Sequence, residues 1–165
     1  MYRRSTRETR LEELAAPVRE ALTKHAAQHQ LTIGSDVRVW ITHSENPPAD
    51  GFFGKLFSQR ANSADPDAEH DSIIVLHSSH LVFVTTGDKR GTTALSVPLA
   101  VASMQRGSAI AAKLGVTGPN DGVTVTGFPG DHGNAGSYFV GLGPDAAGAA
   151  CASAIEAAIV LAKNR

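Results

Sequence analysis

One hairpin signal constrains the fold of this chain more than any other feature. Residues 72–87, SIIVLHSSHLVFVTTG, place four polar residues, His77-Ser78-Ser79-His80, between two runs of β-branched and aromatic residues. Such runs favour strands, and serine hydroxyls can hydrogen-bond the open backbone of a turn. The pattern predicts two antiparallel strands joined by a tight turn at residues 77–80.

The histidines of this turn allow another interpretation, a metal or catalytic site. His77 and His80 could reach one ion together, but a structural metal site normally takes about four ligands. His25 and His29 form a second possible pair on a helix, where polar neighbours favour a solvated face and no third ligand stands nearby. We therefore expect a turn, with no metal and no cofactor.

Short strands and turns continue along the chain. Strands are expected at 36–44, 92–97, 122–128 and 137–143, a further short strand or turn at 99–104, and a short helix at 108–115. Strands joined by short turns favour antiparallel meanders, and such sheets hide their edges by curling toward a barrel. The sequence thus predicts an α+β fold with a strongly bent antiparallel sheet or a small β-barrel of about seven strands.

Helical patterns stand at both ends of these strands. Two possible capping boxes within residues 5–12 precede leucines at helical spacing, and Pro17 either kinks that helix or begins a second one. After Pro144, small and branched apolar residues recur along one helical face. We expect an extra N-terminal helix in an extension of residues 1–34, and a C-terminal helix that caps the sheet of a domain at residues 35–165.

Composition argues against several classes of function. The net charge of −1 speaks against generic nucleic-acid binding, which needs a basic surface. No apolar stretch approaches the roughly 20 residues that span a bilayer, and the arginines of residues 1–10 precede no signal-peptide core. The single cysteine, Cys151, favours a reducing compartment. We expect a cytoplasmic protein without a transmembrane segment.

A long loop at residues 45–71 holds the strongest candidate for a contact surface. It is rich in proline and acidic residues, yet it contains GFFGKLFSQR at 51–60. Apolar side chains in a polar loop either fold back as a lid or dock on a partner groove or a bilayer. In a meander, the loop after the first strand and the turn after the third lie at one end of the sheet and form one rim. The candidate contact residues are Phe52, Phe53, Lys55, Leu56, Phe57, Arg60, Lys89 and Arg90.

Several segments resemble the bacterial pleckstrin-homology-like domains, relatives of GRAM domains. They are IIVLHSSHLVFVTTG, TTALSVPLAVASM, GVTVTGF, SYFVGLG and the helix from Pro144, and SVPLAVASM is similar to the "IPL"-like segment of that family. The resemblance covers roughly residues 36–163. It implies a non-enzymatic binding scaffold, often directed at lipid headgroups or peptides. Members that bind phosphoinositides present several cations between the first two strands, where this chain has Lys55 and Arg60 among more numerous acidic residues.

The leading functional prediction is a non-enzymatic cytoplasmic binding or adaptor module that contacts a protein partner through the 51–60 loop and its rim. Peripheral binding to anionic lipids is the alternative, which screening by salt would reveal. A hydrolase or metal enzyme based on His77, His80 or His132 is less favoured, because no nucleophile elbow or comparable local motif accompanies these histidines. Cys151 lies on the apolar stripe of the last helix and is expected in the core.

Overall fold

Two antiparallel sheets and two long helices make up the described part of the protein. The computed structural model describes residues 3–47, 65–107, 122–130 and 134–165. A five-stranded meander has the order β1 (Arg3–Thr9), β2 (Arg38–Glu45), β3 (Glu69–Leu76), β4 (His80–Gly87) and β5 (Gly91–Pro98). A three-stranded sheet has the order β6 (Ser103–Arg106), β7 (Gly122–Pro129) and β8 (Ala135–Gly141). The helical elements are a 3-10 turn (Leu11–Glu13), α1 (Ala16–Gln28) and α4 (Ala146–Lys163).

The hairpin between β3 and β4 confirms the strongest sequence signal. The strands are antiparallel, and the His77 amide donates to the His80 carbonyl at 3.0 Å. In β4, residues 81–85 are all buried. Successive side chains of this run face opposite sides of the sheet, so a continuous apolar run is required wherever both sides are covered.

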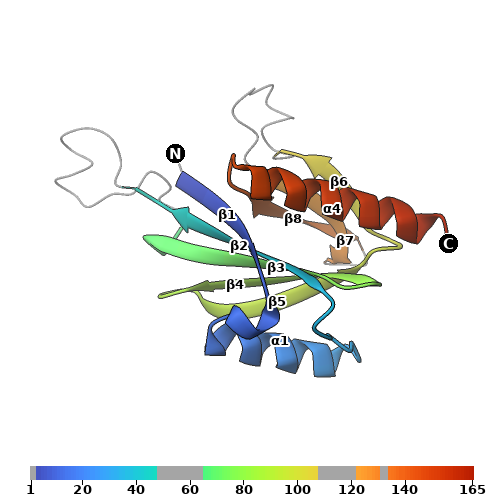
Figure 1. Cartoon of the computed structure of the whole chain (residues 1–165), viewed down its shortest axis with the longest axis horizontal. Coiled ribbons are helices and arrows are strands. Elements are labelled where there is room, and N and C mark those ends of the chain that lie inside the picture. The colour runs from blue at the N-terminus through green and yellow to red at the C-terminus, as the bar shows by residue number, and fades with distance from the viewer. Residues whose placement is uncertain (1–2, 48–64, 108–121, 131–133) are drawn as a thin grey trace.

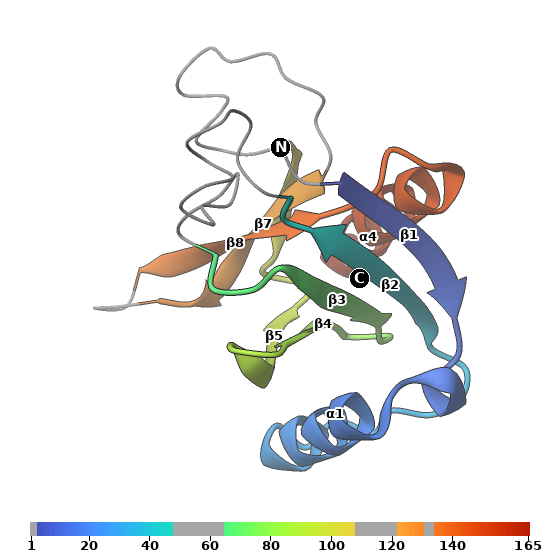
Figure 2. The same cartoon turned by 90° about the vertical axis from the view of Figure 1, so that its left-hand side faces the viewer.

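Each face of the five-stranded sheet carries its own core, as Figures 1 and 2 show. On one face, α1 packs Val18 and Leu22 against the sheet. The other face lies against the three-stranded sheet and α4, in a core that contains Trp40, Phe83 and Ile155. The α+β class, the antiparallel sheets and the C-terminal helix are therefore as predicted.

The sheets do not close into a barrel, so the barrel alternative is wrong. Within residues 3–47, 65–107, 122–130 and 134–165, eight strands form two separate sheets and no strand pairs across them. A side chain of β1 instead bonds to the segment that follows β8. Thr6 Oγ1 of β1 lies 2.8 Å from Thr42 Oγ1 and accepts a hydrogen bond from the Gly143 amide at 2.8 Å.

The first residues of the chain form a strand rather than a helix. β1 pairs with β2 along its whole length, and Thr6 at its centre is buried. α1 begins only at Ala16, with Pro17 in its first turn, where the missing amide costs nothing. A helix that begins at the capping boxes of residues 5–12 is therefore wrong, because pairing with β2 satisfies the backbone groups of residues 3–9. The alternative, a helix that begins at Pro17, agrees with α1.

Two smaller expectations concern the chain after β5. Residues 99–104, expected as a short strand or a turn, contain both: the Ala102 amide donates to the Pro98 carbonyl at 3.1 Å and closes a turn, and β6 begins at Ser103. The helix expected at 108–115 lies outside the described residues.

The C-terminal helix α4 is present where the apolar stripe predicts it. Its N-cap is Asp145, whose carboxylate accepts from the Gly148 amide at 2.7 Å. Cys151, Ile155 and Ile159 lie on its buried face. With 18 residues and a mean hydropathy of 1.5, α4 would also suffice by length and composition to cross a membrane, a test that core helices pass as well.

Candidate functional site

The predicted contact surface lies only partly within the described residues. The segment with Phe52, Phe53, Lys55, Leu56, Phe57 and Arg60 lies outside them. Lys89 and Arg90 stand in the turn between β4 and β5, where Lys89 is exposed and Arg90 is half-buried. The part of the contact surface that can be described therefore consists of the residues that flank the 48–64 segment and of the β4–β5 turn.

Arg90 is held by two carboxylates that precede β3. Its Nε lies 2.6 Å from Asp67 Oδ2, and its Nη2 contacts the Asp65 carboxylate. Asp67 is only 1% exposed, and its Oδ1 accepts from the Lys89 amide at 2.7 Å. The Arg90 guanidinium first, and then this amide, lower the pKa of Asp67 against the opposing effect of desolvation. Arg90 thus positions the turn, and Lys89 presents its charge to solvent.

The residues that flank the 48–64 segment are bonded to each other beside this cluster. The Asn46 amide at the end of β2 donates to the Ala68 carbonyl at 2.7 Å. His70 Nδ1 lies 3.3 Å from the Asp65 carboxylate, and burial first, then Arg90, lower the pKa of His70. The end of β2, the start of β3 and the β4–β5 turn therefore meet at one end of the sheet, which is the arrangement that strand order predicts (Figure 2).

The segment His77–His80 is a turn built around a structural histidine. The Ser79 amide donates to His77 Nδ1 at 3.2 Å, so Nε2 carries the proton of the neutral ring and donates to the Thr32 carbonyl at 3.1 Å. Both ring nitrogens are therefore engaged. His80 Nδ1 lies 2.8 Å from the Ser79 hydroxyl. The ring of His77 thus connects the segment between α1 and β2 to the β3–β4 hairpin. The prediction of a turn at residues 77–80 is confirmed.

His25 is buried, which corrects the expectation of a solvated helix pair. It is 8% exposed, and its Nε2 lies 2.9 Å from the Ser96 hydroxyl on β5. The ring of His29 lies 4.2 Å from that of His25 between centroids. Burial, then His29 and His80, lower the pKa of His25, while burial, then His77 and His29, lower that of His80. These imidazoles cluster where α1 ends, yet no three metal-binding side chains of the described chain are placed to hold an ion.

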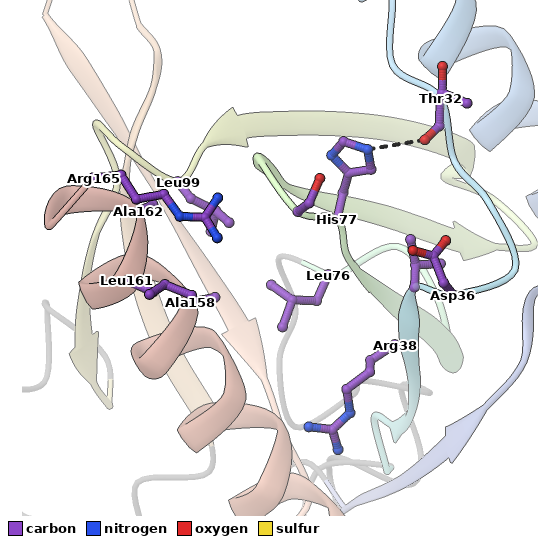
Figure 3. A pocket seen from close by; sticks show the side chains of 12 residues that line it. Thr32, Asp36, Arg38, Leu76, His77, Leu99, Ala158, Leu161, Ala162 and Arg165 are labelled. Atoms are coloured by element: carbon purple, nitrogen blue, oxygen red, sulfur yellow. Dashed lines mark hydrogen bonds between the residues drawn. The ribbon is translucent and has the colours of Figure 1, made fainter.

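A cleft of about 460 Å³ opens between the C-terminal end of α4 and the adjoining ends of β2 and β3 (Figure 3). Leu76 lines its sheet side and Leu161 its helix side. In Figure 3, the side chains of Arg38 and Arg165 extend into this space from opposite walls. Apolar walls with a few polar groups are typical of small-ligand sites.

Charge pairing limits what the cleft can bind. Arg38 donates to the Glu8 carboxylate from Nε at 2.8 Å and from Nη2 at 3.1 Å, and its guanidinium lies 4.5 Å from the Trp40 ring centroid. Its charge is therefore already compensated, whereas phosphate recognition needs a surplus of donors. Ser78 lines the cleft, but the engaged ring nitrogens of His77 cannot activate it.

Cys151 is a core residue, as its place on the apolar stripe predicts. The side chain is fully buried between α4 and the sheets. Burial raises the pKa of its thiol to about 12, so the nucleophilic thiolate is scarcely populated at neutral pH.

The comparisons with known proteins give no relative. No family model, no curated protein and no solved structure matches this chain. The resemblance to pleckstrin-homology-like domains therefore stays a prediction.

Proposed function

We propose that this protein is a non-enzymatic cytoplasmic binding module of the pleckstrin-homology-like kind, which contacts a protein partner through residues 51–60 and the neighbouring rim at Lys89. The supporting observation is the ionic cluster of Arg90, Asp65 and Asp67 at the base of that segment. Moving charges out of water is costly, so a buried ion pair is a poor source of stability and is better explained by the geometry that it fixes.

The cluster fixes the base from which the segment departs and to which it returns. Asn46 on one side and residues 65–68 on the other are bonded to each other, and Arg90 bonds the second side to the rim turn. Contact loops on rigid scaffolds are common carriers of binding, because a fixed base lowers the entropy lost on association. Phenylalanines in such a loop would supply the apolar anchors on which most interface energy depends.

Replacing Phe52, Phe53 and Phe57 together with serine tests the proposal. We expect the triple variant to lose the partner that the wild-type chain captures in a pull-down, while its melting temperature stays nearly unchanged. The matched control is Val101→Ser, which removes an apolar side chain that is 64% exposed at a distant turn and should leave capture intact.

Two outcomes would count against the proposal. A triple variant that unfolds would show that the phenylalanines belong to the core. Flotation with anionic vesicles that is strong at low salt, weak at high salt and absent for the triple variant would instead assign the segment to lipid binding, since salt screens that attraction.

A further inference from the structure

We propose a second binding site on this protein, a cavity between α1, β5 and the β7–β8 hairpin that takes an uncharged aromatic molecule with an N–H donor. The cavity has a volume of about 530 Å³, within the range of about 300–1,000 Å³ that is typical of small-molecule sites. Figure 2 shows β5 between α1 on one side and the hairpin on the other. Because the hairpin lies against β5, the remaining space suits a small molecule rather than a further strand.

The cavity has a buried floor and an exposed mouth. Phe128 is 7% exposed and His25 is 8% exposed, and both line the floor. Pro129, Ser137 and His29 also line the cavity but are exposed, so they stand at its mouth. A molecule that reaches the floor therefore has protein on several sides.

The β7–β8 hairpin contributes an aromatic wall. The ring centroids of Phe128 and Tyr138 lie 6.2 Å apart. Behind them, the buried ring of Phe83 lies 5.6 Å from Phe128 and 5.8 Å from Tyr138 between centroids. Rings that pack on one another are held in fixed orientations, and a further ring gains from offset or edge-to-face contact with them. This wall favours an aromatic ligand over an aliphatic one.

The lining excludes a charged ligand. No Asp, Glu, Lys or Arg of the described chain lines this cavity, whereas three other cavities include Asp36, Arg19 and Arg106, respectively. Burial lowers the pKa of His25, so its ring is uncharged at neutral pH. A charged molecule would lose its water here without gaining an opposite charge, which is costly. The ligand that fits is therefore uncharged.

His29 supplies the hydrogen-bond acceptor. The hydroxyls of the lining already have partners: Ser96 Oγ lies 2.9 Å from His25 Nε2. Ser137 Oγ lies 2.8 Å from Thr126 Oγ1. A neutral imidazole has one acceptor nitrogen, and the exposed ring of His29 stands beside that of His25 at 4.2 Å between centroids. A ligand N–H can donate to His29 while its ring lies against the aromatic wall.

The probe is indole, compared with three analogues in titrations of the ¹⁵N-labelled chain at about pH 8, where imidazoles are neutral. We expect indole to shift the amide signals of β5 and the β7–β8 hairpin with a dissociation constant of about 0.1–5 mM. 1-Methylindole lacks the N–H donor and should bind about fivefold more weakly. Indole-3-acetate and tryptamine, which carry opposite charges, should also bind more weakly than indole.

A blocking variant, Gly136→Phe, locates the site. Gly136 lines the cavity from β8, and a Cβ atom there would meet its nearest neighbours at 3.5 Å, which is ordinary contact. Strand alternation directs the new ring to the face that carries Tyr138, and therefore into the cavity. We expect indole to bind this variant about tenfold or more weakly. Ala135→Phe adds the same ring to the exposed opposite face of β8 and should bind indole as the wild type does.

His29→Ala tests the acceptor without filling the cavity. This exposed substitution should remove the difference in affinity between indole and 1-methylindole, because the N–H donor no longer has a partner. His43→Ala is the matched control, since His43 stands on β2 and does not line the cavity. It should keep the difference.

Several results would overturn the proposal. One is the absence of any shift with indole up to about 10 mM, and another is equal binding to both phenylalanine variants. A difference between indole and 1-methylindole that survives in His29→Ala would remove His29 as the acceptor. Tighter binding of either charged analogue would contradict an uncharged ligand. A dimer in sedimentation that Gly136→Phe dissociates would assign the cavity to a contact between two copies of this chain.

Discussion

At the scale of single residues, distant partners decide which charges remain available. Arg90 was a candidate contact residue, but its guanidinium is committed to Asp67, 23 positions away in the chain. Arg38 is likewise committed to Glu8, 30 positions away. Lys89, next to Arg90, stays exposed. Residue type alone therefore does not identify a binding cation, because the neutralising carboxylate lies in a distant segment of the chain.

The histidine cluster at the end of α1 makes stability depend on pH. The pKa values of His25 and His80 lie below 6.5 in the folded protein, so the unfolded chain binds these protons more readily. Their contribution to stability is complete above about pH 6.5 and is lost as the pH falls through the lowered values. We expect His25→Gln to flatten the fall in the free energy of unfolding between about pH 7 and pH 5, measured by urea titration.

Gln28→Ala is the control for this measurement. Gln28 is an exposed residue at the end of α1 that carries no ionisable group, so its replacement should leave the slope unchanged. An unchanged slope in His25→Gln would mean that burial of His25 does not control the response to acid.

At the scale of elements, strand pairing overrides the local helix signal near the N-terminus. β1 completes the sheet beside β2, and it also meets the start of α4, where the Asp145 carboxylate accepts the Thr6 amide at 2.7 Å. One carboxylate thus caps α4 and ties it to the first strand. This contact couples the two ends of the chain.

Asp145→Ala tests that coupling. The substitution leaves the amides of Gly148 and Thr6 without their acceptor, and we expect it to lower the free energy of unfolding by about 1–2 kcal/mol in denaturant titrations. Asp145→Asn keeps an acceptor oxygen and should cost less. Equal stability of the alanine variant and the wild type would show that water replaces both bonds without loss.

At the scale of the whole molecule, one sheet serves two cores. Val82 and Val84 of β4 face α1, while Leu81 and Phe83 face the core with α4. In the N-terminal segment, β1 is a strand of this five-stranded sheet and α1 packs on one of its faces. A shared sheet should make the molecule unfold as one unit.

Matched side-chain truncations in the two cores test whether the molecule unfolds as one unit. Leu22→Ala on α1 and Ile155→Ala on α4 should each cost about 2–5 kcal/mol, because both side chains are buried. We expect circular dichroism and the fluorescence of Trp40 to report one coincident transition for each variant. A separate early transition in Leu22→Ala alone would show that α1 unfolds as an independent extension.

Local patterns predicted the β3–β4 hairpin, the antiparallel strands, α4 and the core position of Cys151. Each of these features follows from side-chain periodicity over a few neighbouring residues, which can be read directly from the sequence. The same reasoning missed the burial of His25 and the cleft beside Arg38. Both depend on which helix passes over which strand, and no spacing within one segment carries that information.

The sequence by itself determined the strands β2 to β5 and the helix α4, since these choices rest on propensity and alternation between neighbouring residues. Only the tertiary structure decided that residues 3–9 join the five-stranded sheet, that the two sheets stay unclosed and that Arg90 is neutralised. The physical reason is that strand pairing and charge compensation are contacts between residues far apart in the chain, and they are chosen by competition among all available partners.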